Sequence, residues 1–322
     1  MGIALKMYKQ GFIQRFDKDG IIPYLSNEDF EGLNFFKGTF KNSIGLNISY
    51  FAYYYDNYKK DKYVLFCPGI GPGHTQYTRE IEKLASCGYF VLTLDYTGCS
   101  ESEGESLLSV NAPTRDVNDL LCLTKNGKLE NFSFLKDMEI VVVGHSLGAY
   151  TALNTINIQP FIKKAVIISG FIDVISEMKG LSHIYLSILF SDVKRYERKT
   201  NKEYSNIKNM KYLKETNDDI LFIHSMDDSL VPYKTSTYRV YKKYKDKKFE
   251  FVIVNGKDHN PNYELDSLKY MKETFSELNS LVNSGKIKTI EEKQAFMSNK
   301  DIWKMTNQDE DIFKKIIDFI EK

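Results

Sequence analysis

A serine between two glycines, in the Gly-x-Ser-x-Gly sequence of residues 144–148, is the pattern in this chain that most directly suggests chemistry. An apolar run ending at Val143 precedes it, and a helix-forming run starting at Ala149 follows it. The glycines suit a sharp turn, because a Cβ at either position would crowd the strand or the helix. Such a turn places the Oγ of Ser146 at the carboxyl end of a sheet, near the positive end of a helix. The spacing therefore indicates a nucleophilic serine.

This strand, turn and helix resembles the nucleophile elbow of the α/β-hydrolase family. A Gly-x-Ser-x-Gly match arises by chance in roughly one chain in ten of this length, so its context must supply further support. Serine is a poor nucleophile until a base takes its proton, and histidine has a pKa suited to that task. The resemblance implies that an acid and then a histidine follow the serine along the chain, each after a later strand.

Histidine is rare here, and the five candidates for the base are His74, His145, His183, His224 and His259. Only His259 follows the last expected strand, so the resemblance assigns it the role of base; a solvated loop histidine is the alternative. His145 is a neighbour of Ser146 in a tight turn, and we expect it to point away and pack beside the elbow. His74 is expected either to contact substrate or to start a helix, and His224 to be structural.

The acid is one of a pair, Asp227 or Asp228. In the family the corresponding loop resembles His-Gly-x-x-Asp-x-x-Val-Pro. Alignment on His224 and on the Val-Pro pair that follows puts the acid at Asp228, which would fix the tautomer of the histidine. Asp227 is then expected to point elsewhere and to cap the turn. Ser225 departs from the glycine of the family without touching the chemistry.

An oxyanion hole needs two backbone N–H groups, and the resemblance implies Leu147 and Ile70 as their donors. Leu147 directly follows the nucleophile, and Ile70 lies in a glycine-rich loop, residues 68–74, after an apolar strand. The family commonly has His-Gly-x-Gly here, and Pro68 replaces the histidine. The loop lacks the Lys-Ser/Thr pair of a phosphate-binding P-loop, so binding of phosphate is the weaker interpretation.

A further stretch, residues 95–102, resembles the Asp-x-Arg-Gly-x-Gly-x-Ser turn of many α/β-hydrolases, with departures at Thr97 and Ser100. The resemblance runs from about Asn34 to His259, plus a closing helix. It is nearest to bacterial cytosolic serine hydrolases with a small helical cap, a group that includes monoacylglycerol lipases, feruloyl-type esterases and serine aminopeptidase-like proteins.

Short apolar segments alternate with helical patterns, which predicts an α/β fold with a doubly wound, mostly parallel sheet. A hairpin is expected first, over residues 34–40 and 47–56. The later strands are predicted at residues 63–67, 89–94, 139–143, 165–169, 220–224 and 249–254. The helices between them are predicted at residues 75–86, 115–124 and 146–156.

Residues 171–218 interrupt this alternation and are too long for one loop, so we expect a helical cap inserted into a single core of residues 1–170 and 219–322. A connecting helix with a charged tail is the alternative. The apolar side chains expected to line an acyl pocket, or to form the core of the cap itself, are Tyr185, Leu186, Leu189 and Phe190. Two amphipathic helices, residues 265–281 and 311–320, are predicted in the tail, around an excursion at 285–307 with no assigned role.

The composition is that of an ordinary globular protein of 322 residues, with a net charge of +1 that suggests no nucleic-acid partner. Its four cysteines show no Cys-x-x-Cys spacing, which is typical of a reducing compartment. The first residues lack a signal-peptide pattern, and no apolar run is long enough to cross a membrane. We therefore expect a cytoplasmic protein without stable membrane insertion. The oligomeric state is not predicted.

Together these patterns predict a carboxylic-ester hydrolase that uses Ser146, Asp228 and His259 on a small-molecule acyl ester. No metal and no organic cofactor are expected. A thioesterase, an acyltransferase or a small peptidase would use the same residues and remain open. A non-catalytic binding protein of this fold is less favoured, because such proteins usually lose one of the three residues.

Overall fold

The computed structural model describes residues 2–18, 20–182, 190–247 and 249–322. Within them eight strands form one sheet, in the order β1-β2-β4-β3-β5-β6-β7-β8. In chain order the strands are β1 (Asn34–Lys41), β2 (Asn47–Tyr54), β3 (Lys62–Cys67), β4 (Phe90–Leu94), β5 (Glu139–His145), β6 (Lys164–Ile168), β7 (Asp219–Ser225) and β8 (Phe249–Val254).

The sheet is mostly parallel. β4, β3, β5, β6, β7 and β8 run in one direction, whereas β2 is antiparallel to both of its neighbours, β1 and β4. The β1–β2 hairpin turns at Gly45, whose φ of 87° is unstrained only for glycine. The predicted fold class and the predicted strands are confirmed, with boundaries that differ by one or two residues.

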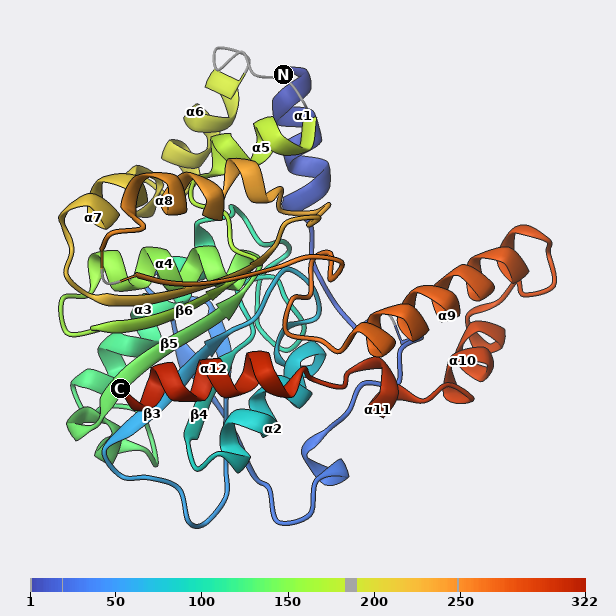
Figure 1. Ribbon diagram of the computed structural model, residues 1–322, viewed down its shortest axis with the longest axis horizontal. Helices are drawn as coiled ribbons and strands as arrows, with labels where there is room; N and C mark the ends of the chain where they lie inside the picture. The colour runs from blue at the N-terminus through green and yellow to red at the C-terminus, as the bar shows by residue number, and fades with distance from the viewer. Residues whose placement is uncertain (1, 19, 183–189, 248) are drawn as a thin grey trace.

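Both faces of the sheet are buried, as a parallel sheet requires. In β3 the side chains of Tyr63 and Leu65 join one apolar cluster, and those of Val64 and Phe66 join the other. The helices that pack on the first face are α3 (Ala112–Lys125), α4 (Leu147–Ile158), α7 (Asn209–Glu215) and α8 (Thr237–Tyr244). Those on the second face are α2 (Thr78–Ser86) and α12 (Glu310–Glu321), seen in front of the sheet in Figure 1.

The helix predicted over residues 75–86 begins instead as a 3-10 turn, η2 (Gly73–Tyr77), before α2. The carboxylate of Asp95 accepts a hydrogen bond from the backbone N–H of His74 at 2.9 Å, and Gly73 has a φ of 78°. This tight bend after β3 delays the regular helix. Other short turns of this kind are η1 (Asn27–Asp29), η3 (Ser133–Asp137) and η6 (Tyr233–Thr235).

The chain begins with a helix that the sequence did not predict, α1 (Ile3–Phe12). Its buried residue, Tyr8, donates a hydrogen bond to the carboxylate of Glu197 on α6 (Ser191–Thr200). In Figure 1, α1 stands beside α5 (Val174–Ser182) and α6. A contact across 189 residues of sequence leaves no local signal, which explains the omission.

The segment between β6 and β7 contains α5, α6, η5 (Tyr204–Asn206) and α7. Three of the side chains predicted to line an acyl pocket, Tyr185, Leu186 and Leu189, lie outside the described residues. The fourth, Phe190, is 1% exposed and belongs to the apolar cluster on the α3 and α4 face.

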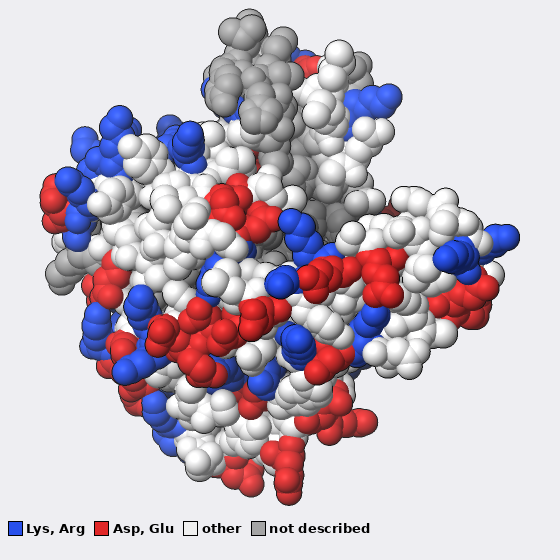
Figure 2. Space-filling view, turned by 45° about the vertical axis from the view of Figure 1, so that its right-hand side comes forward, with Lys and Arg blue, Asp and Glu red and all other residues white. Residues whose placement is uncertain are grey.

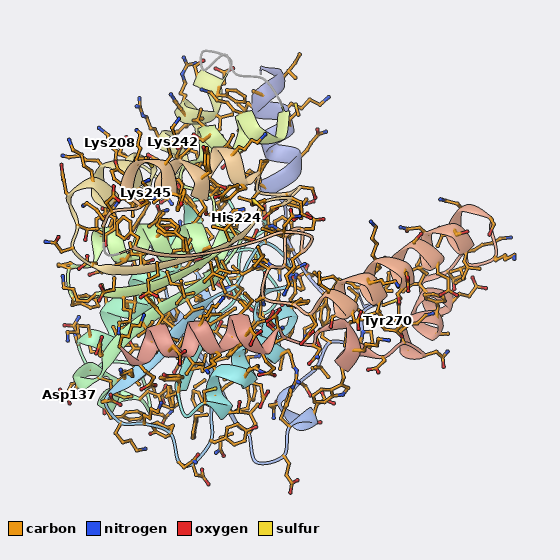
Figure 3. All side chains as sticks on the ribbon, in the orientation of Figure 1. Asp137, Lys208, His224, Lys242, Lys245 and Tyr270 are labelled. Atoms are coloured by element: carbon orange, nitrogen blue, oxygen red, sulfur yellow. The ribbon has the colours of Figure 1, made fainter. Side chains whose placement is uncertain are left out.

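The tail departs from the body before it returns as α12. Helices α9 (Leu265–Asn283), α10 (Ile290–Ser298) and α11 (Ile302–Met305) form a projection, here called the C-terminal arm (residues 264–308), visible on the right of Figure 1. The arm has a small apolar cluster of its own around Leu278, Met297 and Met305. Figure 3 shows Tyr270 on this arm, where its hydroxyl accepts a hydrogen bond from the N–H of Asp301 at 3.1 Å.

Figure 2 shows acidic and basic side chains interspersed over one face, in keeping with 44 basic and 43 acidic residues in the sequence. Among the described helices, none combines the length and the apolar character that crossing a membrane would need.

A buried carboxyl joins α2 to the base of the arm. The amide of Asn262 donates hydrogen bonds to Glu80 at 3.3 Å and to Gln308 at 2.7 Å. Burial raises the pKa of Glu80 to about 7. Because the folded state holds this proton more tightly than the unfolded chain, the wild type loses stability as pH rises from about 4.5 to about 7.

We therefore expect Glu80→Gln to gain stability over the wild type as pH rises through that window, because the amide cannot ionise. The gain should approach roughly 3 kcal/mol above pH 7, from about 1.4 kcal/mol for each pH unit. Urea unfolding of both proteins at pH 4.5 and pH 8 measures it. A difference in unfolding free energy that is the same at both pH values would contradict the expectation.

Candidate active site

The predicted elbow lies at the carboxyl end of β5. That strand ends at His145 and α4 begins at Leu147, so Ser146 alone makes the turn, with φ 57° and ψ −120°. A serine rarely adopts a positive φ, and such strain persists only where the surrounding structure imposes it. Here the N–H of Ser146 is held by the carbonyl oxygen of Ile168 on β6, at 2.9 Å.

The two glycines of the motif allow the backbone to approach closely. A Cβ on Gly148 would lie 1.9 Å from the carbonyl oxygen of Cys67 at the end of β3. A Cβ on Gly144 would lie 2.2 Å from the carbonyl oxygen of Gly148. These contacts leave no room for a side chain, as the motif predicts.

The structure places Asp228, and not Asp227, against His259. Nδ1 of His259 lies 3.0 Å from each oxygen of the Asp228 carboxylate. Asp227 instead accepts a hydrogen bond from the N–H of Gly256 at 2.8 Å and one from the hydroxyl of Ser225. It therefore fixes the turn that leads to the histidine.

Asp228 is buried, but it is well supplied with donors. Its carboxylate accepts hydrogen bonds from the N–H groups of Val231, at 2.7 Å, and Leu230, at 3.0 Å, and Nε2 of His224 lies 3.2 Å away. Burial alone would raise the pKa of Asp228, but the hydrogen bonds from His224, His259 and Val231 outweigh it and hold that pKa well below its usual range. Figure 3 shows His224 inside the body of the protein.

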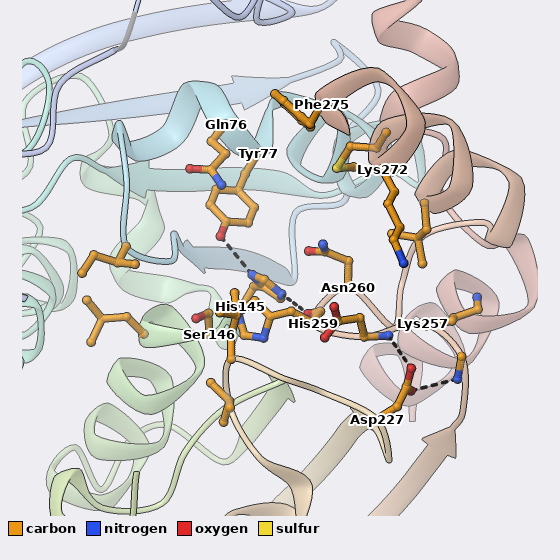
Figure 4. A pocket seen from close by; sticks show the side chains of 18 of the residues that line it. Gln76, Tyr77, His145, Ser146, Asp227, Lys257, His259, Asn260, Lys272 and Phe275 are labelled. Atoms are coloured by element: carbon orange, nitrogen blue, oxygen red, sulfur yellow. Dashed lines mark hydrogen bonds between the residues drawn. The ribbon is translucent and has the colours of Figure 1, made fainter. Parts of the chain in front are cut away.

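Ser146 and His259 open onto the same cavity, and Figure 4 shows their side chains next to each other. No hydrogen bond joins their side chains among the described residues. Such contacts are often long before substrate binds, so the geometry is compatible with proton transfer from Oγ to Nε2.

His145 points away from the serine and holds the histidine loop. Its Nε2–H donates to the carbonyl oxygen of His259 at 2.9 Å, which leaves Nδ1 as the acceptor for the hydroxyl of Tyr77 at 2.9 Å (Figure 4). Burial, together with the neighbouring His259, lowers the pKa of His145 to about 3, so the ring stays neutral. Its place beside the elbow matches the expectation from the sequence.

Ile70 and Leu147 line the cavity next to Ser146. Within the described part of the chain, no acceptor is bonded to either backbone N–H, and Leu147 is the first residue of α4. The N–H of Leu147 lies at a helix N-terminus, which favours developing negative charge, and that of Ile70 lies in the loop after β3, so both donors are available for an oxyanion.

The cavity has a volume of about 970 Å³ and draws its walls from several parts of the fold. Phe12 of α1, Phe171 after β6 and Glu177 of α5 contribute to it. One face of α9 forms a further wall, with Leu265, Leu268, Lys269, Met271, Lys272 and Phe275. Figure 4 shows Lys272 and Phe275 on the α9 side of this cavity.

Two predicted binding residues are absent from the described cavity wall. His74 is 3% exposed; its Nδ1 lies 2.9 Å from Asp95, and its ring stacks on Phe51 with centroids 3.5 Å apart. His74 lies in the 3-10 turn η2, which agrees with the expectation that it starts a helix and not with the expectation that it contacts substrate. Phe190 is packed in the core instead of facing the cavity.

Sequence reasoning missed Phe12 and the α9 wall. The sequence predicts α9 as an amphipathic helix, because its apolar side chains recur every three or four residues. Nothing in the local sequence indicates that the apolar face of this helix lies toward Ser146. No group of His, Cys, Asp and Glu side chains in the described residues has the arrangement needed to hold a metal ion.

The sequence profile of the prolyl oligopeptidase family matches residues 75–278, more than half of the chain. The chain belongs to the prolyl oligopeptidase family. It is thus a serine hydrolase of the α/β-hydrolase superfamily, which the elbow had suggested. The match includes Ser146, Asp228 and His259, and it ends within α9.

Solved structures similar to this family member share its fold at low sequence identity. An esterase of Pyrococcus furiosus has a TM-score of 0.59 and 18% identity, over 84% of this chain and 98% of that one. An acetyl xylan esterase from Paenibacillus sp. R4 has a TM-score of 0.54 and 13% identity, over 80% and 86%. A puromycin-hydrolysing peptidase of Mycobacterium tuberculosis has a TM-score of 0.50 and 18% identity, over 69% and 36%.

Among curated proteins, an epoxide hydrolase of Caballeronia sordidicola is 31% identical over 103 residues. That match covers 32% of this chain and 29% of the epoxide hydrolase, so the chain spans less than a third of the length of this relative. The similarity is local.

The close contact at Gly148 leads to a stability prediction. Gly148→Ala should lower the free energy of unfolding by about 1–3 kcal/mol, because backbone atoms would have to move apart. In the matched control, Gly11→Ala, the new Cβ meets nothing within 4 Å in helix α1, and stability should be unchanged or up to ~1 kcal/mol higher. Urea unfolding measures both. Equal stability of the two variants would show that the elbow tolerates a side chain.

Proposed function

We propose that this serine hydrolase cleaves carboxylic esters through an acyl-enzyme, with Ser146 as nucleophile, His259 as base and Asp228 as the acid that orients it. The observation that carries the proposal is the Asp228–His259 pair, 3.0 Å apart, opening onto the cavity that Ser146 lines. The three residues come from three loops at the carboxyl ends of β5, β7 and β8, where this fold gathers its chemistry.

In the acylation step, Oγ of Ser146 attacks the carbonyl carbon while its proton moves to Nε2 of His259. Asp228 accepts Nδ1–H and stabilises the imidazolium that forms. The N–H groups of Ile70 and Leu147 donate to the oxyanion. When the tetrahedral intermediate collapses, the C–O bond to the alcohol breaks, and His259 returns the proton to the leaving oxygen. Water then repeats the sequence on the acyl-enzyme and releases the acid.

A peptidase is the second candidate, and membership in the prolyl oligopeptidase family favours it. The same three residues would serve, with His259 protonating an amine instead of an alcohol. Comparison of turnover on aminoacyl anilides and on p-nitrophenyl esters separates the two. We further propose that the helices between β6 and β7 act as a cap, because Phe171 and Glu177 of that segment line the cavity.

The roles of the neighbouring aspartates give a matched test. On p-nitrophenyl esters, Ser146→Ala should lose at least about 10⁴-fold in kcat, and Asp228→Asn roughly 10³ to 10⁴-fold, since the amide would favour the wrong tautomer of His259. Asp227→Asn, one residue away, should retain most of the activity. Equal losses in the two aspartate variants, or turnover by Ser146→Ala at the wild-type rate, would refute the assignment.

The α9 wall predicts a dependence on substrate length. Phe275→Ala and Met271→Ala should raise KM for long acyl esters by up to roughly tenfold, a loss of ~1.4 kcal/mol of apolar contact, and leave short esters unaffected. Ile290→Ala on α10 is the control, because that side chain is 56% exposed outside the cavity. KM values for acetate to decanoate esters measure the effect. An unchanged ratio of long to short esters would exclude α9 from substrate binding.

A further inference from the structure

A buried carboxyl in the cavity wall keeps one oxygen without a hydrogen-bond partner among the described residues. Glu177 of α5 is 3% exposed and lines the cavity that contains Ser146 and His259. Its Oε2 is buried and has no hydrogen-bond partner among the described residues. A buried polar atom without a partner lowers the stability of the folded protein by about 1–3 kcal/mol, and a purely structural role for Glu177 gives no reason for that loss.

Glu197, on the next helix, is a buried acid with a purely structural role and serves as a comparison for Glu177. It is 5% exposed and lies outside the cavity wall. Its carboxylate accepts hydrogen bonds from the hydroxyl of Tyr8 and from the amide of Asn111. Both oxygens of Glu197 are thus engaged, whereas Glu177 keeps an unsatisfied oxygen at the substrate cavity.

The surroundings of Glu177 are negative. Burial raises its pKa well above the usual range, and the carboxylates of Asp228 and Asp173 add to that shift. Asp173 is already paired with Arg239 at 2.8 Å. No ion pair joins Glu177 itself to a lysine or arginine in the described chain. A positive group placed beside Glu177 would therefore be attracted by its own carboxyl and by the nearby Asp228 carboxylate.

We propose that Glu177 determines substrate specificity by binding a protonated amine on the substrate. This inference rests on the proposed ester or amide hydrolysis, and it narrows the substrate class to acyl compounds that carry an ammonium group. An ammonium beside this carboxyl stabilises its ionised form and donates a charge-assisted hydrogen bond to the unsatisfied oxygen. A purely apolar substrate would leave that oxygen without a partner and gain nothing from it.

Two pairs of esters, each differing by one charged group, test the proposal. Alanine benzyl ester and isobutyric acid benzyl ester differ by an ammonium in place of a methyl group on the acyl side. Dimethylaminoethyl butyrate and 3-methylbutyl butyrate differ on the alcohol side by a protonated tertiary nitrogen in place of a CH group. The wild type should favour the amine of at least one pair by about tenfold or more in kcat/KM, and the pair that responds tells which side of the ester Glu177 reaches.

Glu177→Gln should abolish that preference, because it lowers kcat/KM for the amine ester far more than for its neutral counterpart. Glu197→Gln removes an equally buried acid outside the cavity and should keep the preference. Thermal unfolding verifies that both variants fold; Glu177→Gln should be no less stable, because no partner in the described protein is lost.

Calorimetric binding of the same esters to Ser146→Ala, with and without Glu177→Gln, separates this inference from the chemistry. If no ester is turned over but the amine still binds more tightly through Glu177, the proposed hydrolysis fails and the amine site stands. Equal rates and equal affinities for amine and neutral esters would overturn the amine site. A preference that survives in Glu177→Gln would overturn it as well.

Discussion

The hydrogen bond from His145 to the carbonyl oxygen of His259, 2.9 Å long, joins the serine elbow to the histidine loop. The other nitrogen of the same ring, Nδ1, accepts a hydrogen bond from the hydroxyl of Tyr77. A side chain at Gly69 would collide with that hydroxyl. Loops that follow β3, β5 and β8 are thereby fixed relative to one another through one neutral imidazole. Because burial lowers the pKa of His145 to about 3, the ring stays neutral near neutral pH and both hydrogen bonds are kept.

Two carboxyls near the same cavity have opposite environments. Asp228 has hydrogen-bond donors on both oxygens, from His224, His259 and backbone N–H groups, and its pKa is depressed. Glu177 lacks such donors among the described residues, and its pKa is raised. Divergent environments of this kind separate the roles of two acids in one site, so one remains a permanent anion and the other can respond to what binds.

Much of this arrangement could be predicted from the sequence, because the elbow, the order of strands and the loops that carry Asp228 and His259 are encoded locally. The rest depends on contacts between distant segments. Tyr8 and Glu197 form a hydrogen bond although they are 189 residues apart, and no periodicity in the sequence predicts such a contact. His74 lies in a loop that points to a substrate role, yet tertiary packing against Phe51 and Asp95 decides its position.

The C-terminal arm leaves and rejoins the body at nearly the same point. The N–H of Asp309 bonds to the carbonyl oxygen of Asn262 at 2.8 Å, and that of Glu264 bonds to Asn307 at 3.1 Å. The two ends of the arm are already held together, so the arm closes without displacing the sheet or α12. A change in its length therefore costs little additional loop-closure entropy. Changes within the arm therefore act on one wall of the cavity, from a segment that lies outside the loops of Ser146, Asp228 and His259.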